Sequence, residues 1–402
     1  NMKICFLSLN LFMHGGIQRI IPNIINGMTK EHEITIVMPY SNKDNNIFGL
    51  NNEIKIKNLN DFPRHNKYTL IGAFSLAVWK INKRIGILNN EIGADILLKT
   101  LYATKQKKGL IQYFNDNSFD IIIALTDYYS LLLAMIAPEL KAKTIGWQHN
   151  TYESYFLMKN RNSYGQEVLF KKMMKNLNHL IALTDTDKVK FSESFGVETS
   201  TLYNPVSFDI CNKEPRKENP LIFVGRIYQY QKGIDYLIDI VDEIRKKKEN
   251  VKIVLVGDGP DKKNLEENVE KRNLQDCIKF VGMSSDVAEY YKNASVFLHT
   301  SRYEGFGVVL VEAMAFGIPV VAFHNNGPDE IISNGKNGFL IEKYDITSFA
   351  EQVINLLEDD GLYRYISLNA KKRAEDFLPK KVTERFEEIL TKVLLEEGVE
   401  MQ

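Results

Sequence analysis

Two carboxylates in the last third of the chain lie in a stretch where packing alone gives no reason for them. Glu304 opens the segment "EGFGVVLVE" and Glu312 closes it, with two glycines and an apolar run between. Two nearby carboxylates suggest the acid/base pair of a hydrolase. A single carboxylate can instead accept two hydrogen bonds from a vicinal diol of a ribose or a sugar. Because valines and a leucine surround Glu312, we expect a polar group to meet it there.

The glycines of this stretch predict an anion site. Gly305 and Gly307 precede an apolar helix, so the first amides of that helix lack acceptors in the preceding turn. Such amides and the helix dipole stabilise negative charge that lies or develops nearby. The backbone groups expected to take part are those of Phe306, Gly307, Val308 and Val309.

Two further turns carry groups that suit phosphate. "VGRIYQYQKG" offers Arg226 and Lys232 across a strand-to-helix turn, and two fixed cations suit a diphosphate. Surface turns often hold such residues without a ligand, so this pair alone is moderate evidence. "HGGIQR", after the first expected strand, places Gly15 and Gly16 at a helix start, where backbone amides can approach an anion. A plain tight turn explains those glycines equally well.

Three other motifs are less specific indications of a binding site. "VGDGPD" has Gly257 and Gly259 but no third glycine at the dinucleotide-binding spacing, so it could wall off a base with backbone atoms. His149, in "GWQHNTYES", follows an expected strand and is either a structural histidine or a functional one. Asp185 and Asp187 resemble a metal-binding pair, yet capping of the helix that they open explains them more simply. We therefore expect no metal site.

Short apolar runs that alternate with helical segments would position these turns. In the first half they are "KICFLSL", "EITIVM", "IIIAL", "TIGWQH" and "LIALT"; in the second half they are "LIFVGR", "KIVLVGDGP", "IKFVGM", "VFLHTS", "PVVAF" and "GFLI". Such alternation predicts parallel sheets covered by helices, that is, two doubly wound α/β domains. Ligands of these sheets bind beyond the carboxyl ends of the strands, where the candidate residues fall.

A polar, proline-containing stretch without periodicity, "VSFDICNKEPRKENP", marks the linker between the halves. We expect a first domain over residues 1–205, a second over 206–380, and a C-terminal helix within 381–402. That last helix could pack on its own domain or cross back to the first.

The overall composition narrows the class of protein. With 402 residues the chain is long enough for two domains. Lys plus Arg and Asp plus Glu each number 51, so net charge gives no reason to expect nucleic-acid binding. The three cysteines are scattered, which fits a reduced cytoplasm and excludes a cysteine zinc cluster. No apolar run reaches the length of a membrane-spanning helix, and the first residues resemble a β-strand more than a signal peptide.

Charge is uneven locally. Between Arg64 and Lys108 nine Lys or Arg residues face two acids, and "LIGAFSLAVWKINKRIGIL" within that range is apolar and basic at once. One interpretation is a solvated helix face. The other is peripheral contact of residues 64–108 with an anionic membrane surface.

Taken in order, the motifs resemble those of glycosyltransferase family four, retaining enzymes with the GT-B fold. The segments that carry the resemblance are the glycine turn at 15–16, "VGR…KG" at 224–233, "VGDGP" at 256–260 and "EGFGVVLVEAMAFGIPVVA" at 304–322. The resemblance spans nearly the whole chain, and the two glutamates match the family's E-x7-E pattern. It implies two Rossmann-like domains that face each other across a cleft, an acceptor-binding one and then a nucleotide-sugar-binding one.

The resemblance also implies a role for each candidate residue. Glu304 and His149 would contact the transferred sugar, and Glu312 would hold the ribose hydroxyls. Arg226 and Lys232 would bind the donor diphosphate, aided by the amides of Phe306, Gly307, Val308 and Val309, and Gly16 would approach the phosphates or the acceptor. The base would lie near Gly257, Gly259, Pro260, Gly282 and Met283.

The function that follows is retaining, metal-independent transfer of a hexosyl or N-acetylhexosaminyl unit from a UDP-sugar. The acceptor would be a glycan, a lipid-linked molecule or a polymer of the bacterial surface, and the enzyme would be cytoplasmic or peripheral at the inner membrane face. Two alternatives stay open from the sequence. One is a phosphorylase or hydrolase of the same fold, and the other is a non-catalytic nucleotide-sugar-binding partner of a second transferase.

Overall fold

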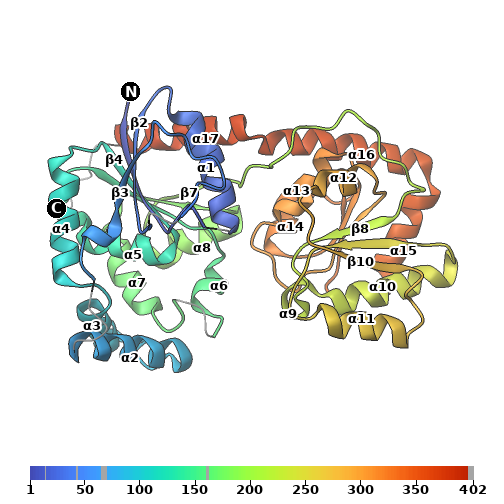
Figure 1. Cartoon of the computed structure of the whole chain (residues 1–402), viewed down its shortest axis with the longest axis horizontal. Helices are drawn as coiled ribbons and strands as arrows, with labels where there is room; N and C mark the ends of the chain where they lie inside the picture. Colours follow the sequence, from blue (N-terminus) through green and yellow to red (C-terminus); the bar gives the residue numbers. More distant parts are fainter. Residues whose placement is uncertain (14, 42–43, 65–69, 160–162, 397–402) are drawn as a thin grey trace. The chain divides into compact units, whose positions relative to one another are not determined.

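The computed structural model describes the chain except residues 14, 42–43, 65–69, 160–162 and 397–402 (Figure 1). The chain divides into two compact units. The first consists of Asn1–Tyr203 together with Val382–Gln402, and the second of Asn204–Lys381. Each has its own parallel sheet with helices on both faces (Figure 1).

In the first unit the described strands form one sheet in the order β3-β2-β1-β4-β5-β6-β7. The strands are β1 (Lys3–Leu7), β2 (Glu33–Met38), β3 (Lys55–Asn58), β4 (Ile121–Leu125), β5 (Lys143–Trp147), β6 (His179–Ala182) and β7 (Thr199–Thr201). Every described pairing is parallel. β1 and β4 are adjacent although four α-helices and two strands separate them in sequence, so the order reverses direction between them.

Helices of the first unit cover this sheet. They are α1 (Gly16–Met28), α2 (Leu70–Ile85), α3 (Glu91–Thr100), α4 (Thr104–Asp116), α5 (Thr126–Ile136), α6 (Tyr152–Phe156), α7 (Glu167–Met174) and α8 (Asp185–Phe195). The central strands are runs of isoleucine, leucine and valine because both faces of a parallel sheet are buried; all five residues of β4 are buried.

The last helix, α17 (Pro379–Leu395), adds its apolar stripe to the first unit from Val382 onward. Phe386 of α17 is fully buried, with its ring centroid 4.7 Å from that of Trp147 and 6.3 Å from that of Phe6. Burial of one such ring contributes about 1.5–3 kcal/mol. The end of the chain therefore belongs to the same core as its first strand.

In the second unit the described strands follow the order β10-β9-β8-β11-β12-β13. They are β8 (Leu221–Val224), β9 (Ile253–Val256), β10 (Ile278–Gly282), β11 (Phe297–His299), β12 (Val320–Phe323) and β13 (Phe339–Ile341). Their helices are α9 (Gln229–Lys232), α10 (Ile234–Lys247), α11 (Lys262–Lys271), α12 (Val287–Lys292), α13 (Val308–Ala315), α14 (Asn326–Ile331), α15 (Ile346–Glu358) and α16 (Asp360–Ala374).

The sequence pattern predicts this α/β fold class correctly, and each of the eleven quoted apolar runs contains a strand. Two strands lie outside those runs, β3 and β7. β3 reads "KIKN" and none of its residues is buried; β7 is only three residues long. Edge strands this short or this polar carry no apolar run, so the hydrophobic pattern cannot reveal them.

The polar segment 206–220, which was expected to be the linker, lies at the start of the second unit and contains no helix or strand among its described residues. Its cysteine, Cys211, is a free thiol, as are Cys5 in the first unit and Cys277 in the second. Among the described helices, none is both long and apolar enough to span a membrane.

Candidate functional site

Three glycine-containing loops meet at the carboxyl edge of the second sheet. They follow β8, β9 and β10, which are neighbours in that sheet. The amide of Gly225 donates to the carbonyl of Val256 at 3.0 Å, and that of Gly257 donates to the carbonyl of Gly282 at 2.8 Å. The predicted base-binding segments are therefore joined by their backbones. Met283, directly after them, is 83% exposed.

The glycines of "VGDGP" have a structural role of their own. A Cβ atom at Gly257 would lie 1.9 Å from the carbonyl oxygen of Gly225, and one at Gly259 would lie 2.2 Å from that of Ile227. Side chains at these positions would push the loops apart. Packing thus accounts for both glycines, and contact with a base stays a prediction for them and for the exposed Pro260.

Lys232 is fixed by the loop after β11. Its carbonyl accepts a hydrogen bond from the Thr300 hydroxyl at 3.0 Å, and the Arg302 amide donates to the carbonyl of Gln231 at 2.8 Å. The Arg302 guanidinium binds Asp235 of α10 through both nitrogens, at 2.9 and 2.5 Å. These contacts join the ends of β8 and β11, where the strand order of this sheet reverses. Ligands of doubly wound sheets bind at such a point.

Lys232, Glu304 and His299 form a cluster at that point. Lys232 Nζ lies 2.5 Å from Glu304 Oε2, and His299 Nε2 lies 3.4 Å from the same oxygen. Burial alone would raise the pKa of the Glu304 carboxyl, but the charge of Lys232 and the hydrogen bond from His299 hold it well below its usual range. Glu304 is therefore ionised at any physiological pH. Burial lowers the pKa of His299, although Glu304 opposes that shift, so its imidazole is neutral.

Among the described residues, no hydrogen bond or ion pair joins Arg226 to this cluster. Its side chain is exposed, with the guanidinium carbon 5.7 Å from the Tyr228 ring centroid. Tyr228 contacts Tyr230, and Tyr230 contacts Tyr303, which adjoins Glu304. The structure thus places Arg226 beside a row of tyrosines that the sequence patterns did not single out.

The "EGFG" loop ends in a helix start, as expected from its glycines. α13 begins at Val308, after Gly307 in a left-handed conformation with φ of 85°. The Glu304 carbonyl accepts a hydrogen bond from Gly327 at 3.2 Å, which fixes the loop to α14. The amides of Val308 and Val309 in the first helical turn have no preceding carbonyl within the helix. Phe306 points into the core instead, 3% exposed and in contact with Phe377, so only its backbone can meet a ligand.

Glu312 lies inside α13 and is 3% exposed. Its Oε2 accepts a hydrogen bond from the Tyr291 hydroxyl at 3.0 Å. Tyr291 belongs to α12, is fully buried, and stacks on Phe316 with 5.3 Å between ring centroids. The polar group expected to meet Glu312 thus includes a tyrosine of the protein. This tyrosine orients the carboxylate.

His149 in the first unit follows β5 and is nearly buried. Its ring centroid lies 4.8 Å from that of Trp147, and its amide donates to the Tyr155 hydroxyl at 3.1 Å. Burial lowers the pKa of His149 to about 3, so the ring is neutral at pH 7. Among the described residues, Nε2 of this ring has no hydrogen-bond partner. A buried, unsatisfied ring nitrogen suits a histidine that meets a ligand better than a purely structural one.

We expect the burial of His149 to destabilise the first unit at acidic pH. The unfolded chain takes up a proton near pH 6.5 and the folded chain only near pH 3, so stability falls as the pH drops through this window. From pH 7 to pH 5 the loss is about 2 kcal/mol. Urea unfolding followed by fluorescence reports this unit, because both tryptophans, Trp79 and Trp147, lie in it.

The His149→Gln variant is the control for that measurement. Glutamine does not titrate, so the variant lacks this loss of stability. The free energy of unfolding of the wild type minus that of the variant should therefore fall by about 2 kcal/mol from pH 7 to pH 5. His179, whose pKa burial lowers to about 4, titrates in both proteins and cancels. If the two proteins instead lost stability equally as the pH fell, the pKa of His149 would be the same in the folded and the unfolded chain.

Gly16 is the first residue of α1. A Cβ atom there would meet nothing within 4 Å. Local packing therefore gives no reason for glycine at this position, in contrast to Gly257 and Gly259. The open space beside Gly16 fits the close approach of a ligand.

Three groups near the candidate residues do not stand out in the sequence patterns. His299 ends the strand in "VFLHTS", and the signal that could have revealed it is a histidine at the carboxyl end of a central strand. Tyr291 lies in an ordinary helical pattern and gave none. Asp127, buried in the first turn of α5, accepts a hydrogen bond from Ser163, and burial raises the pKa of its carboxyl.

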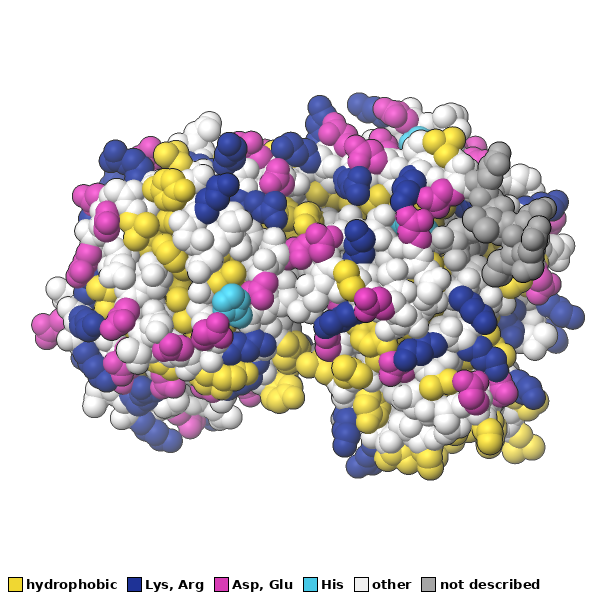
Figure 2. All heavy atoms as spheres, turned by 180° about the vertical axis from the view of Figure 1, so that it is seen from behind, with side chains coloured by type: hydrophobic (Ala, Val, Ile, Leu, Met, Phe, Trp, Pro, Cys, Tyr) yellow, Lys and Arg dark blue, Asp and Glu magenta, His cyan; other side chains and the backbone are white. Residues whose placement is uncertain are grey.

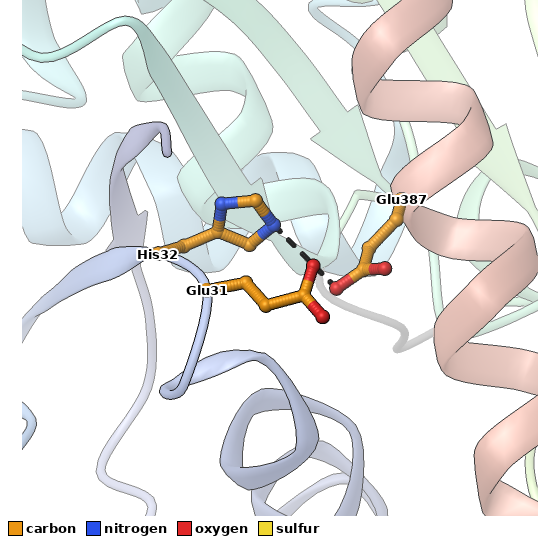
Figure 3. A group of neighbouring side chains, drawn as sticks. All are labelled: Glu31, His32 and Glu387. Carbon is orange, nitrogen blue, oxygen red and sulfur yellow. Dashed lines mark ion pairs between the residues drawn. The ribbon is translucent and has the colours of Figure 1, made fainter.

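Two groups of potential metal ligands were found among the described residues, and neither suits an ion. Figure 3 shows Glu31 and His32 before β2 and Glu387 on α17. His32 Nδ1 accepts the Met2 amide at 3.1 Å, so Nε2 carries the proton and faces Glu387 Oε1 at 3.5 Å. A metal on Nε2 would require both ring nitrogens to be deprotonated. This group is better explained as a polar contact between the His32 ring and Glu387 that holds α17 against the rest of the first unit.

The carboxylates of the second group and of the aspartate pair also interact with other groups of the protein. In His179, Glu198 and Glu396 the two carboxylates pair with Lys392, which supplies the positive charge. Asp187 is buried and accepts a hydrogen bond from the Tyr152 amide at 2.9 Å, while Asp185 binds the Thr201 hydroxyl. Both aspartates therefore stabilise α8 and its surroundings.

Comparison with known proteins agrees with the arrangement of these loops. A family model described as "Glycosyl transferases group 1" matches residues 210–373, which include Arg226, Lys232, Glu304 and Glu312. An uncharacterized glycosyltransferase of Haemophilus influenzae is 26% identical over 394 residues, covering 96% of this chain and 99% of that protein. Residues 210–373 therefore match the group 1 glycosyltransferases, and the chain as a whole is similar to a glycosyltransferase.

Other similarities extend over nearly the full length of the chain. An N-acetyl-D-galactosaminyltransferase of Campylobacter jejuni is 25% identical over 399 residues, covering 98% of this chain and 99% of that protein. The crystal structure of HepE from Anabaena in complex with UDP has the same fold, with a TM-score of 0.71 at 20% identity. It covers 97% of this chain and 100% of that one. The GT-B fold expected from the motifs is confirmed.

Proposed function

We propose that this protein is a glycosyltransferase that moves a hexosyl or N-acetylhexosaminyl unit from a UDP-sugar, with retention of configuration and without a metal ion. The observation that carries the proposal is the cluster of Lys232, Glu304 and His299 beside the start of α13. A nucleoside diphosphate leaves with increasing negative charge on its phosphates. One cation and the amides of a helix start, both held in place beforehand, stabilise that charge.

The donor extends along the loops in our proposal. Arg226 and Lys232 bind the diphosphate together with the amides of Gly307, Val308 and Val309. Glu312, oriented by Tyr291, accepts the ribose hydroxyls. The base lies against the backbones of Gly257–Pro260 and Gly282–Met283. A UDP complex of a protein with the same fold supports this assignment.

Glu304 contacts the transferred sugar but does not attack it. The contacts of Oε2 with Lys232 and His299 draw negative charge from the carboxylate and make it a weaker nucleophile, so we assign Glu304 to positioning and charge stabilisation. Retention then follows from attack on the same face that the diphosphate leaves, with the leaving phosphate accepting the proton of the acceptor hydroxyl. In the first unit, His149 contacts the sugar through its neutral ring, and Gly16 approaches the phosphates or the acceptor.

The acceptor in this proposal is a lipid-linked glycan or another surface polymer of bacteria. The Campylobacter relative, which is similar along its whole length, is named for a glycan on diphosphate-linked undecaprenol. A substrate of that chemistry resides in a membrane. The enzyme would therefore work at the inner face of the cell membrane, and we expect residues 64–108 to meet that surface; residues 65–69 of this range lie outside the described structure.

We expect transfer from a UDP-sugar to persist in EDTA, with the product keeping the anomeric configuration of the donor. UDP should raise the melting temperature by several degrees, since a ligand that binds only the folded state stabilises it by mass action. A panel of nucleotide sugars with sugar-lipid acceptors, followed by NMR of the product, tests both features.

Several outcomes of that panel would contradict the proposal. Loss of turnover in EDTA that returns with Mn²⁺ would remove metal independence, and an inverted anomer would remove retention. Donor cleavage at equal rates with and without acceptor would indicate a hydrolase. Binding of UDP without turnover on any acceptor would favour a non-catalytic partner.

A further inference from the structure

α2 buries two uncharged polar residues and a glycine, and it exposes most of its large apolar side chains. The residues of this helix that are buried are Gly72, Ser75 and Asn82. The residues with large exposed apolar side chains are Leu70 (92% exposed), Ile71 (68%), Phe74 (59%), Leu76 (41%), Ile81 (55%) and Ile85 (57%). A helix that only packed on a globular domain in water would show the opposite pattern. Something other than water therefore suits its outer face.

The inner, polar stripe is fixed, so the helix cannot turn its apolar side inward. Asn82 is 1% exposed, and its side chain donates to the Gly165 carbonyl at 2.8 Å and accepts the Leu88 amide at 2.8 Å. A Cβ atom at Gly165 would lie 2.6 Å from the Cα atom of Gly86. The end of α2 is thus in close backbone contact with the loop that precedes α7, and its orientation is part of the folded unit.

All of these exposed apolar residues except Leu76 lie in one sector of the helix that has a basic border. At about 100° per residue, that sector covers roughly 120° of the helix surface. Its exposed members are Leu70, Ile71, Phe74, Ala77, Ile81 and Ile85, and Val78, also in it, is partly buried against the core. Arg84 and Lys80, both exposed, follow along one side of it, and Lys83 lies beyond them with its Nζ 5.0 Å from the Trp79 ring.

The apolar surface continues beyond α2. Ile87, in the turn after the helix, is 62% exposed, and Ile92 at the start of α3 is 76% exposed. Figure 2 shows hydrophobic side chains together with lysine and arginine side chains at the end of the first unit where α2 lies. Contiguous apolar patches of this kind on a folded protein mark interaction surfaces.

We propose that the outer face of α2 docks on an anionic phospholipid membrane, with Phe74 and Ile81 at the acyl boundary and Lys80 and Arg84 at the headgroup phosphates. An apolar sector with a basic border is what an interfacial helix requires. The net charge of the whole chain is zero, so the attraction is local to this face. A second copy of the chain fits less well, because its basic border would meet the same charges.

This inference deepens the acceptor side of the proposed function, but its test does not depend on glycosyl transfer. Vesicles of phosphatidylcholine with about one-third phosphatidylglycerol are floated with the protein, and pure phosphatidylcholine vesicles serve as the reference. We expect at least tenfold stronger partitioning onto the anionic vesicles, and weakening with added salt. Equal partitioning onto both vesicle types, or none, would overturn the proposal.

Two double variants assign the binding to α2. Phe74→Ser with Ile81→Ser, and Lys80→Glu with Arg84→Glu, should each reduce partitioning about tenfold. The matched controls change equally exposed residues of the second unit, Leu368→Ser, and Lys246→Glu with Lys247→Glu, and should leave it unchanged.

Further readouts separate docking from misfolding and from dimerisation. All variants should keep the wild-type melting temperature and UDP-induced stabilisation; failure of UDP to bind any of them would bear on the proposed function alone. A Phe74→Trp variant should shift its emission to the blue on anionic vesicles. A wild-type dimer that the apolar double variant converts to monomer, without vesicle binding, would assign the face to a second copy instead.

Discussion

Glu304→Gln should lower kcat by about 10²- to 10³-fold while UDP binds as tightly as to the wild type or up to about tenfold more tightly. The carboxylate charge is held against Lys232 at 2.5 Å and His299 at 3.4 Å. That charge can stabilise a cationic sugar centre in the transition state. Glutamine keeps the shape but removes the charge, so the loss falls on the chemical step.

The opposite effect on UDP follows from the same ion pair. In the wild type, Lys232 neutralises Glu304 before any donor arrives. With glutamine at position 304 the ammonium group has lost its counter-ion and is largely buried, which is costly for it. A diphosphate then supplies the missing negative charge. Steady-state kinetics and calorimetric titration with UDP measure the two effects separately.

A matched control distinguishes chemistry from general charge loss. Glu243→Gln breaks a carboxylate–lysine pair with Lys246 on the exposed side of α10, and we expect neither kcat nor UDP affinity to change. If Glu304→Gln abolished UDP binding together with turnover, the residue would be structural. A glycosyl ester found on Glu304 by mass spectrometry would overturn same-face attack.

Much of the fold could be predicted because its core obeys one rule. Strands buried on both faces read as short apolar runs, and β1, β4 and β12 all do so. The edge strands β3 and β7 could not be predicted in this way, because they are short and polar and contain no apolar run. The order of the strands in each sheet depends on long-range pairing, and no local pattern encodes it.

The candidate site was predictable in its parts but not in its pairings. The residue types that follow the strands indicated that Lys232, Glu304 and Glu312 could take part in binding or catalysis. The ion pair of Lys232 with Glu304 joins residues 72 positions apart, and the Tyr291 hydroxyl reaches Glu312 from another helix. Such partners are set by the neighbouring strand order, which brings the ends of β8 and β11 together.

α2 shows a feature that hydrophobic periodicity cannot predict, namely which face of a helix is covered by the protein. Its sequence shows an amphipathic, basic helix, and the usual inference is that the apolar side faces the protein. The structure has the reverse, because Asn82 and the glycines beside it hold the polar stripe against the unit. Helical spacing gives the two faces of a helix, but only the contacts show which face is covered.

Glu312→Gln should weaken UDP binding roughly 10- to 100-fold and leave kcat at saturating donor nearly unchanged. The carboxylate is 3% exposed and is oriented by the Tyr291 hydroxyl at 3.0 Å. A carboxylate can accept several hydrogen bonds at once, which suits the two ribose hydroxyls. A hydrogen bond to a charged group is worth about 1.5–3 kcal/mol, which sets that range. Glutamine keeps one acceptor for Tyr291 but presents its amide to the ribose.

A nucleotide without the hydroxyls tests this contact directly. For 2′,3′-dideoxy-UDP the wild type and Glu312→Gln should bind with nearly equal affinity, so the cycle of two proteins and two ligands yields a coupling energy of about 1.5–3 kcal/mol. Tyr291→Phe removes the hydroxyl but keeps the ring on Phe316, and should weaken UDP binding less than tenfold by leaving the carboxylate less well oriented. Equal losses for both nucleotides in Glu312→Gln would mean that the residue supports α13 rather than the ribose. In that case the hydrogen bond from Tyr291 serves packing between α12 and α13.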